Sequence, residues 1–194
     1  MSNLDDQSEL IQALGPVIEC FDKYEIDYFI GGSVASSHHG AARSTLDVDL
    51  SASLGEENIA QIVSSFSGDY YVSEPAIRDA IRRKSCFNLI RLSSSFKVDI
   101  FVSNQRSFDR VAQERSLRIQ LGDPPKISAK MATKEDIILI KLQWYRLGNE
   151  LSERQWNDLT TVVKLNRGYL DLSYLRQWSV DLKVDDLLER LLTA

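Results

Sequence analysis

The sequence has few cysteines and histidines and no long apolar run. Its two cysteines, Cys20 and Cys86, lie far apart and lack metal-ligand spacing around them, so we expect reduced, non-catalytic thiols rather than a disulfide framework. The longest apolar run, near residues 137–140, is far too short to cross a bilayer, and the polar, acidic residues 1–9 do not form a signal peptide. We therefore expect a cytoplasmic protein with no membrane partner.

The chain also has no excess of positive charge, and it is acidic as a whole. The formal net charge is −5 and the pI is near 5.1, which argues against broad electrostatic adhesion to nucleic acid or anionic membranes. Residues 78–97 reverse this sign, because they carry six basic residues against one acidic residue. That segment could serve an anionic ligand, or it could be the solvated face of a helix followed by strand ends.

Hydrophobic periodicity divides the chain into a mixed part and a helical part. With 194 residues and 43% hydrophobic content, it can bury the core of one domain with a small helical addition. The mixed part predicts helices over 5–23, 33–39, 56–66 and 74–83, and strands over 28–31, 46–52, 70–72, 87–92, 96–102 and 116–121. Gly15-Pro16 marks a break or kink in the first helix.

The strongest turn signal, Gly122-Asp123-Pro124-Pro125, supports a boundary between a core over residues 1–125 and a helical region over 126–194. The pattern beyond the boundary predicts helices over 134–147, 153–165, 172–180 and 184–192.

Two acidic residues occupy the polar face of the predicted strand 46–52. Asp47 and Asp49 are two positions apart, so on a strand they point to the same side and repel each other unless a cation lies between them. Magnesium binds carboxylate and phosphate oxygens in octahedral geometry. The pair therefore predicts a binding site for a magnesium–triphosphate complex. The alternative is that the two aspartates lie on an ordinary exposed strand face without a ligand.

Two further motifs complete this candidate site. Asp99, on the alternating strand 96–102, is a third acid that could bind a metal near an attacking hydroxyl, or act as its base. The turn Gly31-Gly32-Ser33 leads into a helix and offers backbone N–H groups, a positive helix end and a hydroxyl. We expect this turn to hold the β and γ phosphates.

Two basic residues are secondary candidates. Arg43 precedes the acidic strand, where it could neutralise phosphate or pair with Asp47. Lys141 could reach the triphosphate, snorkel, or form a structural ion pair, because its helix face is otherwise apolar and holds Ile137, Ile138, Trp144 and Tyr145. Further along, Arg154 and Asp158 fit an i, i+4 surface pair.

In this order, the motifs resemble the DNA polymerase β-like nucleotidyltransferase superfamily. The resemblance rests on Ile30-Gly31-Gly32-Ser33, Asp47-Val48-Asp49-Leu50 and Val98-Asp99-Ile100. The longer string from Gly31 through Gly40, Arg43 and Thr45 to the acidic pair is similar to small bacterial nucleotidyltransferases of the AbiEii and MNT toxin type. The run Ala132-Thr133-Lys134-Glu135-Asp136, leading to Lys141, also looks like the start of their C-terminal helical part.

The resemblance implies an α/β (α+β) fold, with a mixed sheet flanked by helices and a C-terminal helical bundle. It implies nucleotidyl transfer from a nucleoside triphosphate with two Mg²⁺ ions, for which the catalytic and metal-binding residues would be Asp47, Asp49 and Asp99. The nucleotide would be bound by Gly31, Gly32, Ser33, Arg43, Thr45 and Lys141.

The acceptor is left open by these motifs. A hydroxyl on a tRNA 3′ end, on a protein such as a cognate antitoxin, or on a small molecule such as an antibiotic would serve. A toxin–antitoxin or phage-defence component is one form of this function. The alternative is a catalytically silent module that binds nucleotides for regulation or interaction.

Overall fold

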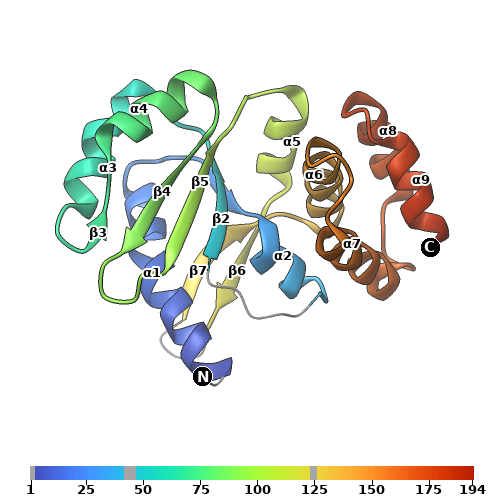
Figure 1. The fold of residues 1–194 in the computed structure, drawn as a ribbon, viewed down its shortest axis with the longest axis horizontal. Coiled ribbons are helices and arrows are strands. Elements are labelled where there is room, and N and C mark those ends of the chain that lie inside the picture. Colours follow the sequence, from blue (N-terminus) through green and yellow to red (C-terminus); the bar gives the residue numbers. More distant parts are fainter. Residues whose placement is uncertain (1–2, 42–46, 123–125) are drawn as a thin grey trace. The chain divides into compact units, whose positions relative to one another are not determined.

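The computed structural model describes residues 3–41, 47–122 and 126–194 (Figure 1). The chain forms two compact units. The first, here called the sheet unit, comprises Met1–Gly31 and Ser44–Met131. The second, the helical unit, comprises Gly32–Arg43 and Ala132–Ala194. Within the described ranges, no helix combines the length and the apolar character needed to cross a membrane.

The described strands of the sheet unit form one seven-stranded mixed sheet in the order β3-β4-β5-β2-β1-β7-β6 (Figure 1). Its strands are β1 (Tyr28–Ile30), β2 (Asp47–Ala52), β3 (Tyr70–Tyr71), β4 (Cys86–Arg91), β5 (Lys97–Val102), β6 (Leu117–Leu121) and β7 (Ile127–Met131). β2 and β5 pair in parallel, as do β1 and β7, while the other neighbouring pairs are antiparallel. The consecutive strands predicted over 87–92 and 96–102 pair with each other as the antiparallel hairpin β4–β5.

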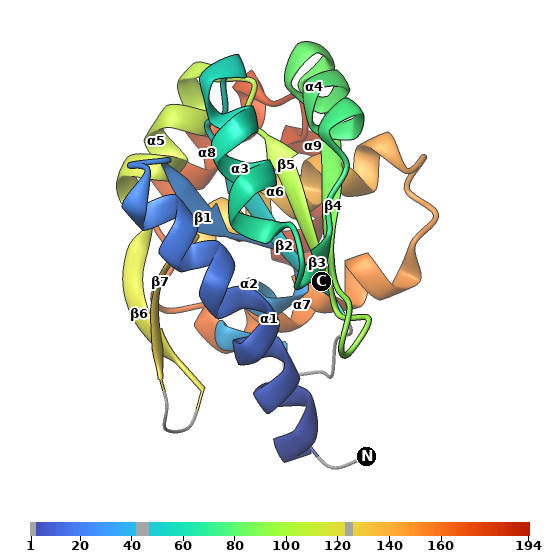
Figure 2. The ribbon, with the colours of Figure 1, turned by 90° about the vertical axis from the view of Figure 1, so that its left-hand side faces the viewer.

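One face of this sheet forms the core of the unit. Val48 and Leu50 of β2 and Val98 and Ile100 of β5 are fully buried, as alternation along each strand requires. The helices α1 (Asn3–Lys23), α3 (Ile59–Phe66) and α4 (Glu74–Arg83) pack on this side (Figure 2). A short 3₁₀ helix, η1 (Glu56–Asn58), precedes α3, and α5 (Ser107–Arg115) follows β5. The opposite face of β2 and β5 carries Asp47, Asp49, Lys97 and Asp99.

The helix α1 continues through Gly15-Pro16, so the alternative of a break there is wrong. Proline removes one backbone donor and usually ends a helix. Here Ala13, Leu14 and Val17, which surround the proline, are all fully buried in the core. Packing of this apolar face stabilises the helix more than the proline weakens it.

The helical unit contains α2 (Gly32–His38), α6 (Lys134–Leu147), α7 (Glu153–Asn166), α8 (Leu172–Asp181) and α9 (Asp185–Thr193). α6 packs on α7 and α8, α9 packs on α7 and α8, and α2 packs on α6 and α7. Thr133, Ser152 and Asp171 cap α6, α7 and α8, and each accepts a backbone hydrogen bond at the third helical position. The expected C-terminal helical bundle is therefore confirmed.

The compact units divide the chain differently from the sequence boundary at residue 125. β7 belongs to the sheet unit because it pairs with β1 and β6. Residues 32–43 join the helical unit, where His39 Nε2 lies 2.8 Å from the Ala132 carbonyl oxygen. Asn166 also donates to the carbonyl of His39 at 2.9 Å. Turn chemistry could not reveal either grouping, because both depend on contacts between distant residues.

Candidate active site

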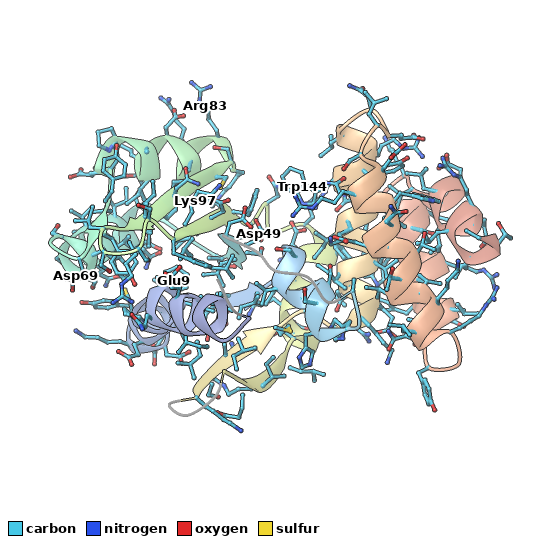
Figure 3. The ribbon with its side chains drawn as sticks, turned by 60° about the horizontal axis from the view of Figure 1, so that its bottom comes forward. Glu9, Asp49, Asp69, Arg83, Lys97 and Trp144 are labelled. Atoms are coloured by element: carbon cyan, nitrogen blue, oxygen red, sulfur yellow. The ribbon has the colours of Figure 1, made fainter. Side chains whose placement is uncertain are left out.

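Three aspartates lie close together on the polar face of the sheet unit. In the parallel pairing of β2 with β5, Asp49 lies opposite Asp99, and Asp47 lies opposite Lys97. Positions two apart on a strand share a face, and neighbouring strands are about 4.8 Å apart. Asp47, Asp49 and Asp99, here called the acidic row, therefore occupy adjacent positions on one face. Figure 3 labels Asp49 and Lys97 on these two strands.

Both carboxylate oxygens of Asp99 have partners. Lys97 Nζ lies 2.6 Å from Asp99 Oδ2, and Asn88 Nδ2 of β4 donates a hydrogen bond to Asp99 Oδ1. The Asp99 side chain is 10% exposed and that of Lys97 is 41% exposed. The sequence motifs did not single out Asn88, and they included Lys97 only as part of the basic segment. The sequence did contain one signal for the Lys97 contact, because Lys97 lies two residues before Asp99 on the same predicted strand.

The charge of the acidic row acts on two neighbouring groups. The pKa of Lys97 is raised by its hydrogen bond to Asp99 and by the negative charges of Asp99, Asp47 and Asp49, against a smaller opposing effect of burial. Lys97 is therefore a cationic counter-ion of the row. Burial, followed by the charges of Asp99 and Asp49, raises the pKa of the Cys86 thiol to about 12. This thiol stays protonated at neutral pH, and both cysteines are free, as the sequence predicts.

The fit of the acidic row to magnesium depends on Asp99. Three carboxylates on one face are the oxygen ligands that magnesium takes, so the donor chemistry fits. Nevertheless, no three His, Cys, Asp or Glu side chains within the described ranges are grouped so that they could hold a metal ion. Asp47 and Asp49 remain the best candidates for metal ligands. Asp99 is the third candidate, and its carboxylate contacts Lys97 and Asn88.

The glycine turn begins beside the acidic row. The Gly31 N–H donates to the carbonyl oxygen of Asp49 at 2.8 Å, within the sheet unit. Gly32, covalently joined to it, starts α2 with a φ of 52°, a left-handed conformation that favours glycine. Ser33 is buried within α2, and Ser36 Oγ donates to the Gly32 carbonyl at 2.8 Å. Phosphate binding by these residues stays a prediction.

Lys141 lies in the helical unit and is 7% exposed. Its Nζ donates to Asp158 Oδ2 of α7 at 2.7 Å, so it forms the structural ion pair that the sequence left open. The surface position predicted for Asp158 is wrong, because this residue is only 8% exposed. Trp144 is 45% exposed, so it does not share the buried face of Lys141. A contact between Lys141 and a nucleotide stays a prediction.

The basic arginines of α4 form exposed ion pairs. Arg78 binds Glu56 and Glu74 at 2.6 and 2.8 Å, while Arg82 and Arg83 both contact Asp79. Figure 3 shows Arg83 projecting from its helix. These contacts match the solvated helix face proposed for this part of the basic segment. The other candidates Arg43 and Thr45 lie outside the described residues.

Comparison with known proteins identifies the fold. No protein-family model and no curated protein matches the sequence. An antigenic nucleotidyltransferase-like protein from Paracoccidioides brasiliensis matches with a TM-score of 0.53 and 19% identity, over 96% of this chain and 92% of its own. The antibiotic-resistance factor ANT(2'')-Ia matches with a TM-score of 0.51 and 9% identity, over 95% and 97% of the two chains.

A weaker match, to the lincosamide antibiotic adenylyltransferase LnuA bound to lincomycin, has a TM-score of 0.46 and 13% identity over 79% of this chain and 96% of its own. At that score it carries no inference. The first two matches show that this chain has the fold of nucleotidyltransferase-like proteins, which confirms the predicted fold class.

Proposed function

We propose that this chain is a nucleotidyltransferase that moves a nucleoside monophosphate from a magnesium-bound nucleoside triphosphate to a hydroxyl group of a small molecule. The observation that supports the proposal best is the acidic row, which gathers Asp47, Asp49 and Asp99 on one face of β2 and β5. The nucleotidyltransferase-like fold gives this row its chemical context.

The proposed reaction forms a bond between the acceptor oxygen and the α-phosphorus, and it breaks the bond from that phosphorus to the pyrophosphate leaving group. Two magnesium ions would neutralise phosphate charge and lower the pKa of the acceptor hydroxyl. Asp47 and Asp49 would hold the nucleotide complex by its metal. Asp99 would orient the acceptor hydroxyl through the second metal or accept its proton.

Residues of the glycine turn and three basic or polar side chains would bind the triphosphate. In this proposal Gly32 offers its backbone N–H to the phosphates and Ser33 adds a hydroxyl. Gly31, whose own N–H is bonded to the Asp49 carbonyl, lets the phosphates approach because it has no side chain. Arg43, Thr45 and Lys141 are the further candidates for nucleotide contacts. Backbone donors suit this task because they add no bulk near the phosphates.

Charge and the comparisons support a small-molecule acceptor in this proposal. A net charge of −5 disfavours a large polyanion such as tRNA. One protein of the same fold is an antibiotic-resistance factor, which favours a small hydroxylated molecule. A tRNA 3′ end and a hydroxyl on a partner protein are the other acceptors to test. The second would support a toxin–antitoxin or phage-defence role.

A second candidate function is supported by the state of Asp99. With its oxygens bound to Lys97 and Asn88, the acidic row does not form a three-ligand metal group. A regulatory module that binds a nucleotide without turnover needs no such group. Asp47 and Asp49 alone would then serve nucleotide binding.

The test incubates the purified full chain with magnesium and each α-labelled nucleoside triphosphate. Acceptors are a panel of hydroxyl-bearing antibiotics, total tRNA and lysate proteins. The Asp47→Asn/Asp49→Asn double variant removes two charges of the row. Asp69→Asn is the matched control, because Asp69 is an exposed aspartate of the same unit and lies away from Asp49 (Figure 3).

Label transfer by the wild type and Asp69→Asn, but not by the double variant, is the expected result. The acceptor that becomes labelled identifies the substrate class. Metal-dependent nucleotide binding without transfer would favour the regulatory module. If nucleotide binding is absent, or equal in the double variant, the proposal fails.

A further inference from the structure

Lys97 and Asp99 form an ion pair within one strand at the acidic row. They lie two positions apart on β5, so both side chains point to the same face, and Nζ lies 2.6 Å from Oδ2. Across the parallel pairing, Lys97 lies opposite Asp47 and Asp99 lies opposite Asp49. The ammonium group therefore faces all three carboxylates of the row.

This arrangement solves an electrostatic problem of the metal-free protein. Three carboxylates on adjacent strand positions repel one another, and Asp99 is largely buried, where such repulsion is least screened. One ammonium group offsets part of the repulsion. Asn88 completes the arrangement by donating to the second oxygen of Asp99.

A divalent cation bound to the Asp99 carboxylate would lie close to the positive charge of Lys97, and the two cations would repel each other. Binding of the cation is therefore favoured when Lys97 moves away from Oδ2. Lys97 is 41% exposed, so its long side chain has room to swing towards solvent when this happens. The fold therefore holds a cation of its own at the site of the third ligand.

We infer that Lys97 is a positioning residue that occupies Asp99 in the metal-free protein and competes with divalent metal for this carboxylate. This inference rests on the proposed function, because the proposed nucleotidyl transfer requires a divalent metal at the acidic row. Lys97 lowers the affinity of the row for free metal ions. The third carboxylate is then released when a metal arrives together with a nucleotide, which adds its own binding energy.

The test measures the metal directly, without turnover. Binding of Mn²⁺ to the full chain is followed by electron paramagnetic resonance, with and without a non-hydrolysable nucleotide. Lys97→Met removes the competing charge, and Lys97→Arg keeps it. Lys130→Met is the matched control, because Lys130 also lies on a strand of the sheet unit and pairs with an aspartate, Asp27, at 3.3 Å.

We expect Lys97→Met to bind Mn²⁺ about three- to tenfold more tightly than the wild type, and Lys97→Arg to bind it no more tightly. Lys130→Met should match the wild type. A second readout is the rise in Tm on adding Mg²⁺. This rise should be larger in Lys97→Met, because its metal-free row has lost the positive charge of Lys97 and its metal affinity is higher.

Equal or weaker Mn²⁺ binding by Lys97→Met, with normal nucleotidyl transfer by the wild type, overturns the inference and leaves the proposed function standing. Tighter binding by both Lys97→Met and Lys130→Met also overturns it, because general charge then explains the effect. If no variant binds Mn²⁺, even with nucleotide, the inference and the metal-dependent function both fail.

Discussion

Lys141 and Asp158 join α6 to α7 by an ion pair of 2.7 Å in which their side chains are only 8% and 11% exposed. Removal of Lys141 takes its positive charge away from the buried carboxylate of Asp158, which is costly inside a protein. We expect Lys141→Met to lower the free energy of unfolding by about 3–5 kcal/mol. Urea denaturation of the purified full chain measures this change.

The exposed pair Arg176–Glu189 is the control for Lys141, since both of its side chains are more than half exposed. Arg176→Met should cost less than about 1 kcal/mol. The double variant Lys141→Met/Asp158→Leu should recover most of the loss. A Lys141→Met protein as stable as the Arg176 variant would contradict the prediction. Nucleotide affinity of the double variant then tests Lys141 as a ligand apart from stability.

The glycine turn offers a second prediction. A Cβ atom at Gly31 would meet no heavy atom within 4 Å, so Gly31→Ala should change the free energy of unfolding by less than about 1 kcal/mol. If the phosphates approach this backbone, the added methyl group obstructs them, and nucleotide affinity should fall about tenfold or more. Isothermal titration with a non-hydrolysable nucleotide measures the effect.

Gly168→Ala is the matched control, because a Cβ there also meets no atom within 4 Å and the residue follows α7, in the helical unit. It should leave nucleotide affinity unchanged. Equal affinities for both alanine variants would exclude Gly31 from the phosphate site.

His39 predicts a pH dependence of stability. Burial lowers its pKa from 6.5, and the charges of His38 and Lys134 act in the same direction, while its contact with the Ala132 carbonyl and the charge of Glu135 oppose them. Because the folded-state pKa is the lower one, the unfolded chain binds the proton first. Stability is therefore complete above about pH 6.5 and falls as the pH decreases through the folded-state pKa.

Titration followed by NMR should give His39 a pKa below 6.5, and the spectrum is simple because the chain has two histidines. Between pH 7 and pH 5, His39→Gln should lose less stability than the wild type. A wild-type pKa at or above 6.5 would refute the prediction.

Cys86 is expected to be a slow nucleophile. A thiol pKa near 12, against an ordinary value of 9.0, reduces the thiolate fraction at pH 8 roughly 1,000-fold. In a Cys20→Ala background, iodoacetamide should therefore modify folded Cys86 far more slowly than the same chain in guanidinium chloride. Mass spectrometry follows the reaction, and comparable rates in the two states would show that the thiol is not held protonated.

The sequence predicted most of the helices and strands, though not β7, because the periods of these elements are local. The alternation around Asp47 and Asp49 marked β2, and the helical spacing beyond residue 134 marked α6 to α9 within a residue or two. It could not show that β2 pairs in parallel with β5, since that register joins residues about 50 positions apart. The hydrogen bond from Asn88 to Asp99 depends on the pairing of β4 with β5, which the sequence pattern does not show either. The ion pair of Lys97 with Asp99 lies within one strand, but it depends on the conformations of the two side chains.

The sequence pattern also could not identify Asp158 as the buried partner of Lys141. Helical spacing favoured Arg154 as the partner of Asp158, because residues four apart are neighbours on a helix. In the folded unit, Asp158 faces inward from α7 and meets a lysine 17 positions earlier. Only the packing of α6 on α7 determines that choice.

The position of β1 has a consequence for synthesis of the protein. β1 lies between β2 and β7, and its parallel contact joins Ile30 to Met131, a partner made about 100 residues later. At roughly 5–20 residues per second, a ribosome needs about 5–20 s to reach it. During that interval β1 is the open edge of a nascent sheet, with unpaired backbone groups that other chains can bind. The growing chain therefore offers this edge to aggregation, and to chaperones, until β7 emerges.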